Sequence, residues 1–142
     1  MSMAFWDASA IVPLCCSQAA TAQGRRLRRE LKRMVVWWGT PLEARSALAR
    51  LVREGRLTAD ERTAAVKLLA QLRASWDEIL PTEKVRSIAE DLPDAHGLRA
   101  ADAAQLAAAL VWCRERPKQQ PLVCFDERLR TAAQALGFSV RP

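Results

Sequence analysis

Four acidic residues have the types and positions needed for metal chemistry. Three of them share one setting, at or just beyond the end of a short apolar segment: Asp7 after Met3–Trp6, Glu43 after Met34–Trp38, and Asp126 after Leu122–Phe125. The fourth, Asp102, lies in the first turn of an alanine-rich segment. Carboxylates that share a site raise each other's pKa unless a cation neutralises them, and Mg²⁺ or Mn²⁺ prefers such oxygen ligands. The four acids therefore predict a metal site suited to hydrolysis of a phosphate ester.

Each acid also has an ordinary structural interpretation. Asp7 and Asp126 fit plain helix N-caps. Glu43 fits the return arm of a capping box whose N-cap is Thr40, and Asp102 fits a pair with Arg99 three residues earlier. Taken singly, each structural interpretation is favoured. Only the shared position of three of the acids, at the carboxyl ends of strands in one sheet, favours a binding crevice.

Two neighbouring residues would support such a site. The hydroxyl of Ser9, two residues after Asp7, is suited to a metal ligand or a hydrogen bond nearby, and equally to a local role at a helix start. Arg99 is suited to holding a substrate phosphate or to pairing with Asp102. No serine–histidine or cysteine–histidine pair is evident, and His96 beside Gly97 is interpreted as a helix-end residue.

The positions of these acids depend on an alternation of strands and helices. Strands are predicted at Met3–Trp6, Met34–Trp38, Trp76–Leu80, Leu122–Phe125 and Phe138–Val140. The segments between them have helical patterns, with a break predicted at Pro93–Gly97. This order predicts an α/β fold whose mostly parallel sheet, of about four to five strands, is flanked by helices. Residues 1–142 are expected to form a single domain.

Composition limits the class of protein. Half of the 142 residues are apolar, which suffices for a core, and no apolar run approaches the roughly 18 residues of a membrane span. The four cysteines form no CxxC pair and have one histidine to accompany them, which argues against a structural zinc site. Reduced, buried thiols and the lack of a secretory pattern at the N-terminus predict a cytoplasmic protein.

The net charge of +6 is concentrated in one segment. Six basic residues crowd this stretch: Arg25, Arg26, Arg28, Arg29, Lys32 and Arg33. Such a block suits a polyanion such as a nucleic acid, and it equally suits a solvated helix face. Beside a phosphate-hydrolysing site, it favours a nucleic acid as the substrate.

Four sequence blocks together resemble the PIN-domain ribonucleases, and more closely the toxin component of VapBC-type toxin–antitoxin systems. The blocks are FWDASAIVPL, TPLEARSALARLVREGRLT, HGLRAADAAQLAAAL and LVCFDERLRTAAQALGF, and they span nearly the whole chain. The resemblance implies a PIN-like fold, Mg²⁺/Mn²⁺-dependent endoribonuclease activity on RNA, a homodimer, and a cognate antitoxin that blocks the site. The family's acidic positions fall on Asp7, Glu43, Asp102 and, more variably, Asp126, and its small hydroxyl position falls on Ser9.

The chain also departs from the family pattern. Pro13 stands where members often have a basic residue, and Gln105 stands where they often have histidine. Neither change affects the acids, so both bear on substrate choice.

Other function classes stay open at this point. The main alternative is a PIN-like RNA-binding or interaction module without catalysis. A small-molecule phosphatase with an aspartyl nucleophile ranks lower, because the second acid typical of such enzymes is replaced by Ser9. A helix-turn-helix DNA-binding protein ranks lowest, since acids at the strand ends would repel phosphates.

Overall fold

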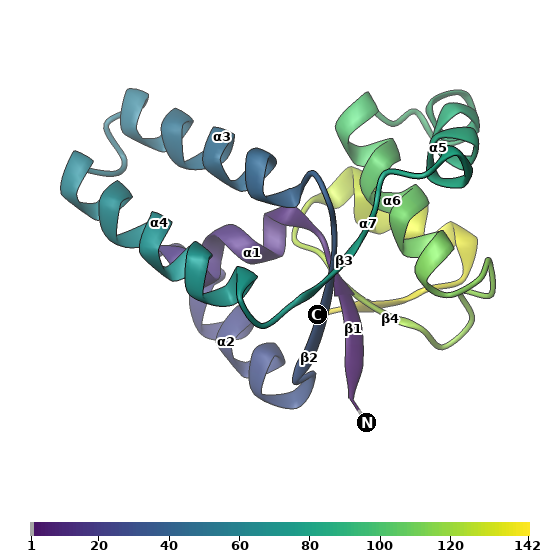
Figure 1. The fold of residues 1–142 in the computed structure, drawn as a ribbon, viewed down its shortest axis with the longest axis horizontal. Coiled ribbons are helices and arrows are strands. Elements are labelled where there is room, and N and C mark those ends of the chain that lie inside the picture. Colours follow the sequence, from purple (N-terminus) through teal and green to yellow (C-terminus); the bar gives the residue numbers. More distant parts are fainter. Residues whose placement is uncertain (1) are drawn as a thin grey trace.

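Five parallel strands form the centre of the fold in the computed structural model, which describes residues 2–142 (Figure 1). Their spatial order is β3-β2-β1-β4-β5, so β1 lies in the middle and pairs with both β2 and β4. The strands are β1 (Met3–Trp6), β2 (Arg33–Trp37), β3 (Asp77–Ile79), β4 (Pro121–Val123) and β5 (Ser139–Arg141). The predicted α/β fold with a mostly parallel sheet is confirmed.

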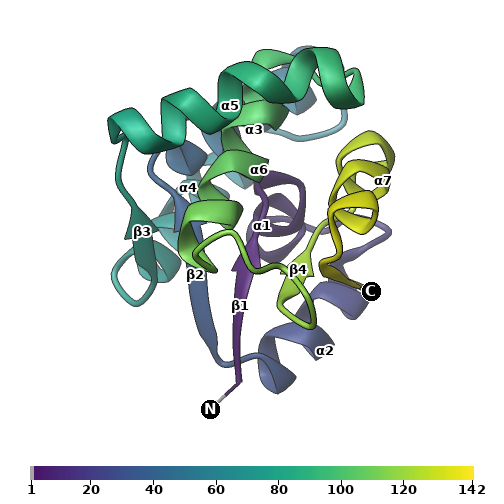
Figure 2. The ribbon, with the colours of Figure 1, turned by 90° about the vertical axis from the view of Figure 1, so that its right-hand side faces the viewer.

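Helices cover both faces of this sheet. The first four in the chain pack on one face, and the last three pack on the other (Figures 1 and 2). They are α1 (Ala8–Cys15), α2 (Thr21–Glu30), α3 (Thr40–Arg53), α4 (Ala59–Arg73), α5 (Glu83–His96), α6 (Ala100–Trp112) and α7 (Glu127–Leu136). Among residues 2–142, none of these helices has the length and apolarity needed to cross a membrane.

The alternation of side chains along β1 builds the two cores. Ala4 and Trp6 belong to the cluster beneath α1, α3 and α4, while Phe5 belongs to the cluster beneath α6 and α7. All three side chains are fully buried. A central strand buried on both faces must be apolar throughout, as β1 is, and the first residue after it is the polar Asp7. The strand therefore delivers Asp7 to the carboxyl edge of the sheet.

One predicted boundary is wrong. The sequence predicts a break at Pro93–Gly97, but α5 continues through Pro93 to His96. Leu92 is buried in the core shared with α6, and this packing offsets the helical hydrogen bond that proline cannot donate. The helix instead ends at Gly97, whose φ of 65° is a left-handed conformation that glycine adopts without strain.

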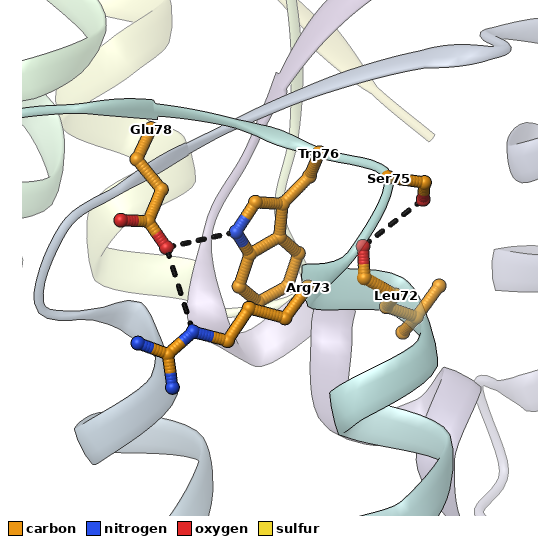
Figure 3. Close-up of polar contacts among 5 residues, drawn as sticks. All are labelled: Leu72, Arg73, Ser75, Trp76 and Glu78. Atoms are coloured by element: carbon orange, nitrogen blue, oxygen red, sulfur yellow. Dashed lines mark hydrogen bonds and ion pairs between the residues drawn. The ribbon is translucent and has the colours of Figure 1, made fainter.

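The junction between α4 and β3 is held by polar contacts (Figure 3). The buried indole of Trp76 donates from Nε1 to Glu78 at 2.9 Å, and Arg73 Nε lies 3.8 Å from the same carboxylate. Ser75 Oγ donates to the carbonyl of Leu72 at 3.0 Å as the helix ends. These contacts fix the entry of β3 at one edge of the sheet.

Candidate active site

The four acids singled out from the sequence line one groove at the carboxyl edge of the sheet. The groove has a volume of about 680 Å³ and takes residues from α1, α3, α6 and the start of α7. Asp7 follows β1 and caps α1, Glu43 and Asp102 lie in the first turns of α3 and α6, and Asp126 caps α7. The structure therefore brings together residues that are up to 119 positions apart in the chain, from Asp7 to Asp126.

Asp7 is the most enclosed of the four, with an exposed fraction of 4 %. Its Oδ2 accepts hydrogen bonds from the backbone N–H of Ser9 at 3.1 Å and from Ser9 Oγ at 2.5 Å. The first of these is the N-cap bond expected for Asp7, so the structural and functional interpretations apply to the same side chain. Both bonds hold the carboxylate in a single orientation at the floor of the groove.

Ser9 and Cys124 link the end of β1 to the segment after β4. Ser9 Oγ accepts the N–H of Phe125 at 2.9 Å while it donates to Asp7. The Sγ of buried Cys124 donates to Asp7 Oδ2 at 3.4 Å and accepts from the N–H of Asp126 at 3.3 Å. The thiol of Cys124 thus joins Asp7 to the backbone of Asp126, and the hydroxyl of Ser9 joins Asp7 to the backbone of Phe125.

The capping-box interpretation of Glu43 is wrong. The helix begins one residue earlier than expected, with Gly39 as its N-cap, so Thr40 is already helical and its side chain is fully buried. Gln105, at 1 % exposure, donates from Nε2 both to Thr40 Oγ1 at 3.0 Å and to Glu43 Oε2. Glu43 is therefore positioned by a side chain from α6 rather than by its own helix start.

The expected pair between Asp102 and Arg99 does not form. Within residues 2–142 no ion pair joins Asp102 to Arg99, which is the extended N-cap of α6. The positive charge of Arg99 still lowers the pKa of Asp102. Asp126 is a true N-cap, and its Oδ2 accepts the N–H of Leu129 at 3.0 Å.

The groove disfavours ionised carboxylates. Burial raises the pKa of Asp7, and the hydrogen bonds from Ser9 and Cys124 offset part of that rise. Burial likewise raises the pKa of Glu43 to about 7, with smaller upward effects from the charges of Asp7 and Asp102. The pKa of Asp102 is raised by burial and then by the charges of Asp126 and Asp7. The acids are thus close enough to repel one another, and a cation between them would relieve that repulsion.

The donor set of the groove fits a hard divalent ion, because all four groups are carboxylates. Among residues 2–142, no three His, Cys, Asp or Glu side chains are already gathered at the spacing of a complete metal shell. Ions such as Mg²⁺ keep several water ligands and use only one or two carboxylates directly, so a partly protein-built shell suits them.

Comparison with known proteins identifies the family. No family model matches the chain. Two curated proteins are similar to it along their length: Ribonuclease VapC45 of Mycobacterium tuberculosis strain CDC 1551 / Oshkosh and Ribonuclease VapC49 of strain ATCC 25618 / H37Rv. Each is 30 % identical over 142 residues, which cover 100 % of this chain and 96 % of the relative. The chain belongs to the VapC ribonuclease family.

Membership in the VapC family confirms the resemblance drawn from the four sequence blocks. The PIN-like architecture expected from that resemblance agrees with the five-stranded parallel sheet between two layers of helices. The assignment of Asp7, Glu43, Asp102 and Asp126 as metal ligands, and of Ser9 and Arg99 as supporting residues, stays a prediction. What the structure adds is their geometry: Ser9 touches Asp7, whereas Arg99 does not line the groove.

Sequence reasoning missed two residues that hold the acids in place. Cys124 lies two residues before Asp126, and Gln105 lies three residues after Asp102, so spacing placed each beside an acid. The sequence marks Gln105 as a departure from the family pattern, and a single amide within an alanine-rich helix also indicates a buried polar contact. Its Oε1 is buried without a hydrogen-bond partner in the described part of the chain.

Ser9→Ala is expected to lower RNA cleavage by roughly 10- to 100-fold, the usual cost of losing a residue that orients a metal ligand, which is the predicted role of Asp7. The change removes the donor to Asp7 Oδ2 and the acceptor for the N–H of Phe125. Initial rates on a fluorescent RNA measure the effect, and the exposed Ser17→Ala variant is the control. Equal rates for the two variants would exclude a positioning role for Ser9.

Proposed function

We propose that this VapC-family protein is a Mg²⁺- or Mn²⁺-dependent endoribonuclease that cleaves phosphodiester bonds in RNA. The observation that carries the proposal is the meeting of four carboxylates, from the starts of four different helices, in one groove at the carboxyl edge of the sheet. The raised pKa values of Asp7, Glu43 and Asp102 support it, because burial and, to a smaller extent, mutual repulsion disfavour their charged forms, and a cation would stabilise those forms.

The chain's own residues would divide the work of hydrolysis. Asp7, Glu43, Asp102 and Asp126 would hold the ion, which supplies positive charge at the scissile phosphate and lowers the pKa of water. Glu43 Oε2 accepts from Gln105, so Oε1 is free to take the proton of the attacking water. The water oxygen bonds to phosphorus, the bond to the leaving ribose oxygen breaks, and that oxygen takes up a proton from solvent water.

The test is cleavage of RNA with and without divalent ions. We expect RNA of mixed sequence to be cut internally when Mg²⁺ or Mn²⁺ is present, and to stay intact when EDTA is in excess. Isothermal titration with Mn²⁺ should show binding below the millimolar range. RNA that is bound but never cut, together with no Mn²⁺ binding, would instead support the non-catalytic RNA-binding module.

The same proposal includes a protein partner. The names of the two relatives place them among the VapC ribonucleases, and a VapC toxin implies a cognate antitoxin. The uncompensated acids of the groove would attract a basic segment of such a partner. A small upstream reading frame encoding a DNA-binding protein, which inhibits cleavage when co-purified with this chain, would support the pairing.

A homodimer and a cytoplasmic location also belong to the proposal. Trp38, Leu42 and Leu80 expose 54 %, 76 % and 58 % of their surface, and the N–H of Trp38 donates to the carbonyl of Ile79 at 3.0 Å, which brings Trp38 beside Leu80; neighbouring exposed apolar side chains favour an interface. All four cysteines are free thiols, as a reducing compartment requires. Light scattering of the purified protein measures the oligomeric state, and fractionation of cells measures the location.

A further inference from the structure

The groove that holds the four acids changes the sign of its charge along α3. One face of this helix lines the groove, with Glu43 near its start and Arg50 near its end, seven residues later. Ser46 and Ala47 lie between them on the same face. Arg56 also lines the groove and lies in the turn between α3 and α4. Because this turn follows the end of α3, Arg56 lies at the same end of the groove as Arg50. The acids thus occupy one end, and two guanidinium groups lie beyond them.

These two cations are available to a ligand. Arg50 is exposed and, within residues 2–142, forms no ion pair with a carboxylate. Arg56 has one carboxylate neighbour, Glu54, at 3.8 Å on the exposed surface, and such pairs contribute little. A planar guanidinium donates two parallel hydrogen bonds to a phosphate, which makes arginine the residue suited to this ligand.

The basic segment noted in the sequence does not serve this groove. Its six residues lie on α2 or just after it, and none of them lines the groove. Two of its members are engaged elsewhere: Arg28 donates to the carbonyl of Lys32, and Arg33 pairs with Asp77 at 3.1 Å. The cations next to the acids come instead from α3 and the turn that follows it.

The spacing suits a nucleic-acid strand. Seven residues of helix separate Glu43 from Arg50 by roughly 10 Å, at about 1.5 Å per residue. A stacked strand repeats its phosphates about every 3.4 Å along the helix axis, so this separation corresponds to about three nucleotides, and to fewer in an extended strand. We propose that Arg50 and Arg56 form a phosphate-binding subsite for the RNA strand, a few nucleotides from the bond that meets the acids. The identity of the ligand as RNA rests on the proposed function.

The subsite also answers an electrostatic problem of the groove. Four carboxylates at one end repel the phosphates that flank the scissile bond, and one metal site neutralises only the phosphate beside it. Arginines further along the strand's path offset that repulsion without touching the acids. They also fix the register of the strand, since contacts to phosphate position a nucleic acid without reading its sequence.

Binding of RNA by matched arginine variants tests the subsite. The probe is a 5′-fluorescein single-stranded RNA of about 12 nucleotides, within the usual site sizes for single strands, in EDTA to prevent cleavage. Arg50→Gln with Arg56→Gln is compared with Arg45→Gln with Arg53→Gln. The control pair removes the same charge from α3, including a helix-end arginine, at exposed positions that do not line the groove. Fluorescence anisotropy at several salt concentrations gives the affinity and its salt dependence.

We expect the groove pair to weaken binding by roughly tenfold, and to reduce the slope of log affinity against log salt by about 0.7 for each phosphate that the variant no longer binds. The control pair should change the affinity less than about twofold, because exposed charges that do not touch the strand act only through the screened long-range field. Equal losses of affinity in both pairs would overturn the subsite.

Cleavage separates failure of the subsite from failure of the proposed function. With Mn²⁺, the groove pair should lose more kcat/KM on the long RNA than on a dinucleotide, whose single phosphodiester is the scissile one and leaves no phosphate for Arg50 or Arg56. Similar losses on both substrates would contradict the subsite while ribonuclease activity stands. If the unmodified protein cuts neither RNA but the groove pair still binds RNA more weakly than the control pair, the proposed activity fails and the subsite is retained.

Discussion

Asp7→Asn is expected to lower the rate of RNA cleavage by at least roughly 100-fold, more than the usual loss from residues that only orient a metal ligand. Asp7 is the most buried acid of the groove, and its Oδ2 accepts from Ser9 and from Cys124. Asparagine keeps the shape and an oxygen that can cap α1, but it loses the negative charge. The chemistry should therefore suffer while the local fold persists.

Two controls make this result interpretable. The melting temperature of Asp7→Asn should match or exceed that of the unmodified protein, since burial already raises the pKa of Asp7 and so opposes its charge. Asp77→Asn is the matched control, because Asp77 is an exposed acid on β3 outside the groove. Cleavage by Asp7→Asn at the rate of Asp77→Asn would remove Asp7 from the metal site.

Glu43→Gln is expected to remove a large part of the pH dependence of stability in the metal-free protein. Burial raises the pKa of Glu43 from an ordinary 4.5 to about 7. Between these values the folded chain keeps a proton that the unfolded chain has lost, so the free energy of unfolding falls as the pH rises. Glu43 is half-buried, and after allowance for solvent screening the loss from this group is about 1–2 kcal/mol.

Denaturant unfolding in EDTA at about pH 5 and about pH 8 measures this effect. The unmodified protein should be less stable at the higher pH. The free energy of unfolding of Glu43→Gln should fall less between the two pH values. Mn²⁺ at the higher pH should then stabilise the unmodified protein more than the variant, because the ion neutralises a charge that the variant lacks. Glu90→Gln, an exposed change of the same kind on α5, is the control. Equal pH dependence in both variants would contradict the raised pKa of Glu43.

Much of the fold follows from local chemistry in the sequence. All five strands lie within two residues of their predicted positions, because short apolar runs between polar, helix-forming segments have few alternatives. The capping box of Thr58 and Glu61 at the start of α4 forms as its pattern indicates. The errors are at points where packing outweighs a local signal. Pro93 stays helical because Leu92 packs on α6, and Thr40 lies inside the helix because Gln105 holds it in the core.

The sequence by itself determined which acids belong together. A parallel sheet brings the carboxyl ends of its strands to one edge, so Asp7, Glu43 and Asp126 converge wherever the strands pair in this way. The rule follows from the topology alone, and it needs no knowledge of side-chain contacts.

Only the tertiary structure decided how these acids are held and which cations lie beside them. Cys124 contacts Asp7, and Gln105 contacts Glu43, each across more than sixty positions of sequence. Arg50 and Arg56 line the groove, whereas the denser basic block on α2 does not. Local patterns record the charge and period of a segment, whereas hydrogen bonds and electrostatic fields depend on distances in space. Those distances are set by the packing of helices onto the sheet.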